Sequence, residues 1–435
     1  MAAIKIPRSQ GNWALKFSLV PIPTGEYRGL GDLHDREYAQ GMLASKVCLL
    51  RNKSYQVSRT LFCCIVQSRS IVSSPQVAEN PAFFTPIPPG NLTLQFKHRI
   101  AGRKYLPGSQ GKGFPEFLAS PRQGLPYALR ADSVSHVSVE KWGKMCREQL
   151  DKAIPEYNAV LFRNLPLFDA KDFAKFASSL GYKPTNYEGG TGNRYLVEGE
   201  TEVYLSTSDP PDFNIELHNE MACSPVHPKK VIFFCLIEPN EELGGVTPLA
   251  RNSEIFAQLD PAVVKKLEEK QIRYTRYLID EKHKPYASWQ QSFMTDDRKK
   301  VEEFLERQNF SYEWEKDTGN LSYWYSLPPL MTHPTTGQKI WFNQPNVHHN
   351  TYYKESPMLD GVTLPDHMYP THTLYGDGSE IEPEVIQHIR ATGWRNAVGF
   401  PWRKRDVLVL DNLTAQHSRL SFSGDRMILA YLTAE

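Results

Sequence analysis

The stretch IELHNEM, residues 215–221, holds a histidine and a glutamate two positions apart, His218 and Glu220. The surrounding residues are typical of a β-strand, and side chains at positions i and i+2 of a strand point to the same face. An imidazole and a carboxylate on one face can hold a metal ion if a third ligand arrives from elsewhere. The alternative is an ordinary polar strand face, so the rest of the chain has to decide.

A non-haem iron site of the open type uses two histidines and one carboxylate, and it leaves positions free for a cosubstrate and oxygen. The chain has 13 histidines, so context matters more than presence. The best candidate for the third ligand is His417, 199 residues after His218, which we expect in a loop between the strand-like segments VLVL and MILAYL. A loop held between two buried strands is a rigid place for a ligand.

Two further residues suit a dicarboxylate ligand. Arg426 follows His417 by nine positions, at the start of the last expected strand, and its guanidinium fork can bind a carboxylate through two hydrogen bonds. Thr247 lies in the segment EELGGVTPLA, where Gly244 and Gly245 permit a tight turn and the threonine hydroxyl could reach the same ligand.

Composition bounds the class of protein. The chain has 435 residues, of which 40% are apolar, and its net charge of +1 gives no reason to expect nucleic acid or an anionic membrane as a partner. No apolar run approaches the ~20 residues that span a bilayer. The six cysteines are too few for a disulfide scaffold and show no C-x-x-C spacing, which favours a reducing, intracellular location.

Hydrophobic patterning predicts a mixed α+β domain with strands in the core and helices at the periphery. Helices are expected at 138–154, 169–180, 261–271, 296–308 and 383–392, the last ending at Gly393. Strands are expected at 159–165, 231–237, 339–344, 407–411 and 427–432.

Residues 1–112 differ from the rest and are interpreted as an extension and linker before a domain at 113–435. Residues 42–75 are basic and serine-rich and contain no acidic residue, as in a mitochondrial transit peptide. That would require translation to begin at Met42; otherwise the segment is a non-catalytic extension and the protein is expected in the cytoplasm. A proline-rich linker is expected at 80–91.

The order of these motifs resembles the Fe(II)/2-oxoglutarate-dependent dioxygenases of the TauD/TfdA superfamily, in the clavaminate synthase-like branch. The shared order is a His-x-Glu, a Gly-Gly-x-Thr-Pro turn, and a distal histidine followed by an arginine. The resemblance covers roughly residues 113–435 and includes GGTGNRY, HNEMACSPVHPKKVIFFC, IWFNQ, YGDGSEI and DVLVLDN. It implies a double-stranded β-helix, or jelly roll, with helices packed outside.

The resemblance also implies roles for residues. His218, Glu220 and His417 would bind Fe(II), while Arg426 and Thr247 would hold the cosubstrate 2-oxoglutarate. The expected reaction is O2-dependent hydroxylation of a small amino-acid-like or carboxylate substrate with release of succinate and CO2. Desaturation or cyclisation at the same iron, and a non-catalytic binding protein on the same fold, are the alternatives.

Two positions narrow this reaction. Ala430 stands where sulfonate-acting members carry a second arginine, which argues against taurine. Glu220 occupies the ligand position that halogenases leave open, which argues against halogenation.

The candidates for contact with the substrate are polar residues near the motifs, each with a structural alternative. For Arg419 that alternative is an outward salt bridge, while Arg194 is expected at a substrate carboxylate. For the asparagines the alternative is structural hydrogen bonding, with Asn219 expected to face away from the metal. The partner is a small molecule, and the sequence is compatible with a homo-oligomer. The candidates are Arg194, Asn214, Asn219, Asn343 and Arg419.

Overall fold

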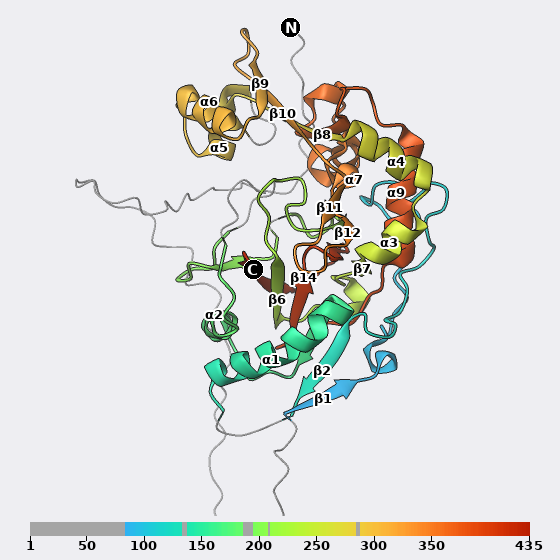
Figure 1. Ribbon diagram of the computed structural model, residues 1–435, viewed down its shortest axis with the longest axis vertical. Coiled ribbons are helices and arrows are strands. Elements are labelled where there is room, and N and C mark those ends of the chain that lie inside the picture. Colours follow the sequence, from blue (N-terminus) through green and yellow to red (C-terminus); the bar gives the residue numbers. More distant parts are fainter. Residues whose placement is uncertain (1–82, 133–136, 186–194, 208, 284–287) are drawn as a thin grey trace, which may run out of the picture. The chain divides into compact units, whose positions relative to one another are not determined.

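A computed structural model describes residues 83–132, 137–185, 195–207, 209–283 and 288–435, drawn in colour in Figure 1. All of them belong to one compact unit, Pro81–Glu435. The basic segment at 42–75 lies outside the described residues. Within them, none of the helices combines the length and the apolar character that crossing a bilayer requires.

A seven-stranded sheet forms the centre of this unit. Its neighbouring strands are antiparallel except β2 and β3, which run parallel. In spatial order the strands are β1 (Phe84–Ile87), β2 (Tyr127–Ala131), β3 (Ala159–Arg163), β14 (Val407–Asp411), β6 (Lys230–Ile237), β16 (Met427–Thr433) and β4 (Val203–Leu205).

Both faces of this sheet are buried, which explains why its central strands are continuously apolar. Alternate residues such as Phe162 and Phe234 pack under α1 (Val139–Tyr157) and α2 (Ala170–Ser179), which Figure 1 shows on one side. The intervening residues, such as Phe233, pack on the other side in a second apolar cluster.

A three-stranded antiparallel sheet contributes to that second cluster through Leu249 and Ala415. It consists of β5 (Ile215–His218), β15 (Ala415–Arg419) and β7 (Leu249–Arg251), with β15 in the middle. A bulge between His417 and Arg419 shifts the register of β15 against β5.

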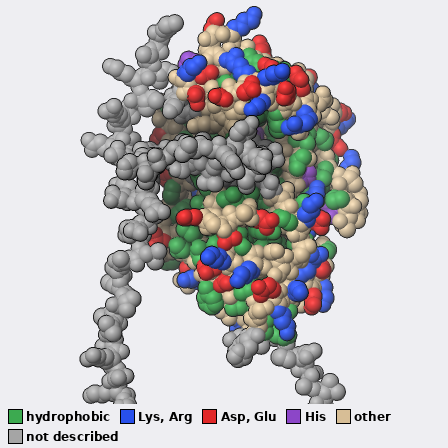
Figure 2. Space-filling model, turned by 90° about the vertical axis from the view of Figure 1, so that its left-hand side faces the viewer, with side chains coloured by type: hydrophobic (Ala, Val, Ile, Leu, Met, Phe, Trp, Pro, Cys, Tyr) green, Lys and Arg blue, Asp and Glu red, His purple; other side chains and the backbone are tan. Residues whose placement is uncertain are grey.

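A four-stranded antiparallel sheet lies farther out, with the order β13 (Thr371–Tyr375), β8 (Ile272–Leu278), β10 (Leu321–Leu327) and β9 (Ser311–Trp314). Helices α5 (Trp289–Phe293) and α6 (Arg298–Arg307) share an apolar cluster with its end. Figure 2 shows acidic and basic side chains interspersed over the face of the molecule on which α6 lies.

The remaining elements surround the small sheets. They are α3 (Asn252–Gln258), α4 (Pro261–Lys270), α7 (Pro345–His348), α8 (Asn350–Lys354), α9 (Pro383–Asn396), the β11 (Leu330–Thr332) and β12 (Lys339–Trp341) pair, and five 3-10 helices at Pro89–Leu92, Glu241–Leu243, Glu281–His283, Pro357–Leu359 and Asp366–Met368.

The structure confirms the mixed composition of helices and several sheets, and it changes two local expectations. The segment expected as a proline-rich linker contains β1, which pairs with β2, so residues 84–112 belong to the folded unit rather than preceding it. Helix α9 does not end at Gly393 but continues to Asn396. Gly393 and Trp394 lie in a buried part of this helix, which packs into the second core region.

Candidate metal centre and cosubstrate site

His218, Glu220 and His417 meet at one point. Their ligand atoms all lie within 4.8 Å of one another. Oε2 of Glu220 is 3.8 Å from Nε2 of His218 and 3.6 Å from Nε2 of His417. The carboxylate is buried, so this cluster of two imidazoles and one acid is withdrawn from bulk solvent.

Strand pairing brings the two histidines together, because His417 of β15 is directly opposite His218 of β5. His417 therefore lies within a strand, and the expectation that a loop carries it was wrong. Glu220 lies just after β5, in a turn where Met221 adopts a φ of 56°. The ring of His417 packs on Phe233, 5.0 Å between ring centres, which places the cluster on the inner face of the large sheet.

The tautomer of His218 suits a metal ligand. Its Nδ1 lies 2.8 Å from the backbone carbonyl oxygen of Glu216, which only accepts hydrogen bonds. This contact places the proton on Nδ1 and leaves the Nε2 lone pair directed at Glu220. Two neutral imidazoles and a carboxylate match the donor set of a divalent transition metal.

Asn412 fixes the backbone of Glu220. Its Oδ1 accepts the N–H of Glu220 at 2.6 Å, and its Nδ2 donates to the carbonyl oxygens of Glu220 at 2.9 Å and of Pro228 at 2.7 Å. Asn412 directly follows β14 and is fully buried. Sequence reasoning did not single it out, although a polar residue at the end of an apolar strand was a usable signal.

Arg426 and Thr247 lie side by side on the adjoining elements. Nε of Arg426 donates to the carbonyl of Gly245 at 3.0 Å, and Nη2 lies 3.4 Å from Oγ1 of Thr247. Trp402 also donates to that hydroxyl oxygen, at 2.9 Å. Burial lowers the pKa of Arg426 to about 9, which still leaves it charged at neutral pH. A fixed cation beside a hydroxyl can bind a carboxylate.

The glycine turn is needed for this arrangement. Gly244 and Gly245 have φ values of +98° and +76°, which residues with a side chain rarely adopt. A Cβ at Gly245 would lie 2.9 Å from Cδ of Arg426, so any larger residue would displace the arginine.

Comparison with known proteins follows this geometry. The family model described as "Taurine catabolism dioxygenase TauD, TfdA family" matches residues 122–432. The dapdiamide synthesis protein DdaC of Enterobacter agglomerans is 30% identical over 312 residues, 70% of this chain and 90% of that protein. The chain belongs to the TauD, TfdA family of dioxygenases.

This TauD-family chain is also similar to a plant protein and to solved structures. Clavaminate synthase-like protein At3g21360 of Arabidopsis thaliana is 28% identical over 330 residues, 74% of this chain and 94% of that protein. Among solved structures, PvcB from Pseudomonas aeruginosa aligns with a TM-score of 0.39 and 15% identity over 70% of this chain and 84% of that chain. An asparagine oxygenase aligns with a TM-score of 0.41 and 12% identity over 68% and 81%.

The residues expected at the substrate are mostly engaged with the protein. Arg419 donates to the carbonyl oxygens of Asp209 at 3.1 Å, Pro210 at 2.6 Å and Phe213 at 2.8 Å, so it holds the loop before β5. Asn214 accepts from Arg103 and from the backbone of Ser421, each at 2.8 Å, and donates to the carbonyl of Lys104 at 2.8 Å.

The other asparagines are also buried. The Asn219 amide donates to the carbonyls of Asn412 at 2.6 Å and Ala415 at 3.0 Å and accepts from Asn252 at 3.1 Å, so it supports the turn rather than the ligand cluster. Asn343 donates to the carbonyl of Pro329 at 2.7 Å, and its buried Oδ1 has no partner among the described residues. Arg194 lies outside the described residues.

A buried ion pair that sequence reasoning missed involves Glu216, two residues before His218 on the same strand. Nε of Arg390 on α9 is 2.7 Å from Oε1 of Glu216, and Asn346 donates to Oε2 at 2.9 Å. Burial raises the pKa of Glu216 to about 7 against the opposing effect of Arg390. The pair anchors the strand whose carbonyl orients His218.

A second group of possible ligands comprises His349, His372 and Glu380. Nε2 of His372 is 3.0 Å from Glu380, while its Nδ1 accepts the N–H of Asn350 at 3.3 Å. An accepting Nδ1 requires the proton on Nε2, where it serves the hydrogen bond to Glu380 instead of leaving a lone pair for a metal. This group is therefore a hydrogen-bonded junction between α8 and β13.

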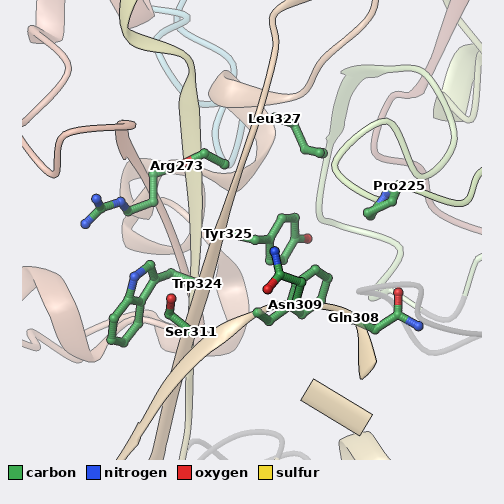
Figure 3. A pocket seen from close by; sticks show the side chains of 10 residues that line it. Pro225, Arg273, Gln308, Asn309, Ser311, Trp324, Tyr325 and Leu327 are labelled. Carbon is green, nitrogen blue, oxygen red and sulfur yellow. The ribbon is translucent and has the colours of Figure 1, made fainter. Parts of the chain in front are cut away.

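A surface groove of 380 Å³ borders the segment that carries the ligands (Figure 3). Its wall includes Pro225, which follows the turn after Glu220, and Trp324 and Tyr325 of β10. The Tyr325 hydroxyl donates to the carbonyl of Cys223 at 2.7 Å, and its ring stacks on Phe310 at 4.0 Å. The four-stranded sheet thus packs directly against the ligand segment.

Proposed function

We propose that this protein is an Fe(II)- and 2-oxoglutarate-dependent oxygenase that hydroxylates a small amino-acid-like or carboxylate molecule and releases succinate and CO2. The observation that carries the proposal is the convergence of His218, Glu220 and His417 within 4.8 Å, in a chain that also pairs Arg426 with Thr247. Membership of the TauD, TfdA family supports the same conclusion.

The three ligand residues would hold the iron, and bound Fe(II) would supply oxygen activation coupled to the decarboxylation of 2-oxoglutarate. The protein's own part is binding and positioning. Arg426 and Thr247 would bind the distal carboxylate of the cosubstrate. The Glu216 carbonyl keeps the proton of His218 on Nδ1. Phe233, which packs on His417, helps to exclude water from the cluster.

The proposal includes a double-stranded β-helix as the arrangement around the site. Two layers support it: the seven-stranded sheet on one side, and the three-stranded sheet with both histidines on the other. Phe233 of the first layer and His417 of the second are in contact across the interior.

The test starts without oxygen. Adding Fe(II) and 2-oxoglutarate to the purified protein should produce the weak charge-transfer absorption toward the red end of the visible spectrum. Admitting air with a metabolite pool should release succinate, and a product heavier by one oxygen atom would identify hydroxylation rather than desaturation or cyclisation. No band and no succinate would refute the proposal and favour a non-catalytic binding protein.

Variants localise the effect. His218→Ala and Glu220→Ala should abolish the band and succinate release while the protein remains folded. His388→Ala is the matched control: it removes a histidine on α9 that accepts the N–H of Asp260 at 2.9 Å. The control should retain both signals, and loss of both in the control as well would show general damage rather than loss of ligands.

A further inference from the structure

Arg276 is placed at the centre of the four-stranded sheet, on the face turned toward the metal ligands. On its two flanks it is opposite Tyr323 of β10 and Thr371 of β13. It shares a strand face with Tyr274, two residues earlier, because side chains alternate along a strand. Tyr274 in turn packs edge-on against His348, with ring centres 5.8 Å apart.

Arg276 has no counter-charge among the described residues. The largest charge effects on its pKa come from Tyr323, Tyr353, Tyr325 and Cys223, and burial raises the pKa of each, so all four are neutral at physiological pH. The guanidinium makes no ion pair or hydrogen bond with any residue in the described part of the chain, and its Nε is shielded from solvent without a partner. An enclosed, unpaired charge is costly.

The other arginines around the site are engaged. Arg390 pairs with the carboxylate of Glu216, Arg419 donates to three backbone carbonyls, and Arg426 donates to the carbonyl of Gly245. Arg276 therefore differs from these arginines in lacking a partner among the described residues.

Two hydroxyls share this situation. The phenols of Tyr323 and Tyr353 make no hydrogen bond with the described residues, although both are close enough to influence Arg276. Part of the Arg276 side chain remains accessible even though protein surrounds it. A partly accessible cation and two phenols thus share the lack of a hydrogen-bond partner among the described residues.

Arg276 and the metal ligands have neighbours in common. Both Arg276 and His218 contribute to lowering the pKa of His348 to about 3, after the larger effect of burial. On the other side, Cys223 lies three residues after Glu220 and is influenced by both Arg276 and Glu220. His348 and Cys223 are thus each close enough to be influenced by both the guanidinium and a residue of the ligand cluster.

We propose that Arg276 binds a carboxylate group of the primary substrate, with Tyr323 and Tyr353 as flanking hydrogen-bond donors. The inference rests on the proposed function and names its substrate class: a monocarboxylic acid held with its reacting carbon toward His218, Glu220 and His417. One unpaired guanidinium balances one negative charge, and its planar fork matches a carboxylate. A phosphate dianion would call for a second cation.

The experiment uses the full-length protein with Fe(II) and 2-oxoglutarate, and a panel of monocarboxylic acids each paired with its own primary amide. Acids should shift the anaerobic charge-transfer band and stimulate succinate release, and their amides should not. In Arg276→Gln, the kcat/KM for the best acid should fall by about 100-fold or more, because a buried charge partner is lost. The band formed without substrate should be unchanged.

Controls separate the two proposals. Arg298→Gln removes an arginine of α6, whose guanidinium lies 4.6 Å from the ring centre of Trp314 on β9 of the same sheet, and should keep the preference for acids. Arg276→Lys should keep that preference with weaker binding. It provides the test of the inference if the Arg276→Gln variant does not fold. A wild type without the band refutes the proposed function itself. A wild type with the band overturns this inference alone if amides match acids, if phosphate esters are preferred, or if no monocarboxylate acts.

Discussion

Replacement of Asn412 by alanine tests how much of the metal site depends on a residue that touches no metal. The change removes three hydrogen bonds, one to the N–H of Glu220 and two to carbonyl oxygens, all of them buried. Leaving each buried group without a partner costs about 1–3 kcal/mol. For three groups we expect a loss of about 3–9 kcal/mol in the free energy of unfolding, to be compared with the usual domain stability of about 5–15 kcal/mol.

The specific effect should appear in metal binding. Without Asn412 the peptide groups on both sides of the Glu220 Cα are no longer fixed, so the carboxylate samples positions away from His218 and His417. Replacing residues that orient a ligand costs about 10- to 100-fold in metal affinity. Anaerobic titration with Fe(II) in the presence of 2-oxoglutarate, followed by the absorption band, measures this affinity, and urea unfolding measures stability.

Asn320→Ala is the matched control. Asn320 is also buried and also makes three side-chain hydrogen bonds: it donates to Tyr277 at 2.8 Å and Glu315 at 3.2 Å and accepts from the N–H of Asp280 at 2.8 Å. It should lose comparable stability and keep its Fe(II) affinity. The reasoning fails if Asn412→Ala binds Fe(II) within twofold of the wild type, or if the control weakens iron to the same extent.

Three further changes have expected outcomes. Gly245→Ala should raise the KM for 2-oxoglutarate by about 10- to 100-fold because the new methyl displaces Arg426; Gly361→Ala, with a similar φ of +77° and open space around it, should not. Arg419→Ala should speed amide hydrogen exchange in the loop whose carbonyls it binds, and unchanged exchange there would contradict the assignment. Burial lowers the pKa of His227 to about 4 from an ordinary 6.5, so the folded protein favours the neutral imidazole, and this stability is lost as pH falls from 6.5 to 4. His227→Gln should flatten the dependence of the free energy of unfolding on pH in that range. An equal slope in the variant and the wild type would contradict this reasoning.

The sequence was sufficient to find the groups that meet in the site, because their order along the chain carries the information. It placed His218, Glu220, His417 and Arg426 in one constellation, and the structure brings the first three together. It could not place His417 within a strand, because SRLSF offers turn-forming and apolar residues in alternation and only pairing with β5 and β7 decides.

The sequence analysis mainly failed to predict contacts between segments that are far apart in the chain. The Glu216–Arg390 pair joins residues 174 positions apart (390 − 216), and neither residue carries a local signal of burial. Arg276 looked like one charge in the alternating segment RYTRYL, and only the sheet shows that no described carboxylate faces it. Gly393 signalled a helix end, but α9 continues through it to Asn396, with buried residues on both sides of the glycine.

The position of β16 has a consequence for synthesis of the chain. It follows the other described strands in chain order, yet it lies inside the large sheet, between β6 and β4. Until it emerges from the ribosome, β6 presents an unpaired apolar edge, which is a site for aggregation. His417 and Arg426 are translated shortly before it, so the sheet edge is covered and the set of metal ligands is completed at nearly the same time. A nascent or truncated chain without His417 and β16 would therefore be prone to aggregation and unable to retain iron. Both properties would distinguish it from the complete folded protein in the cell.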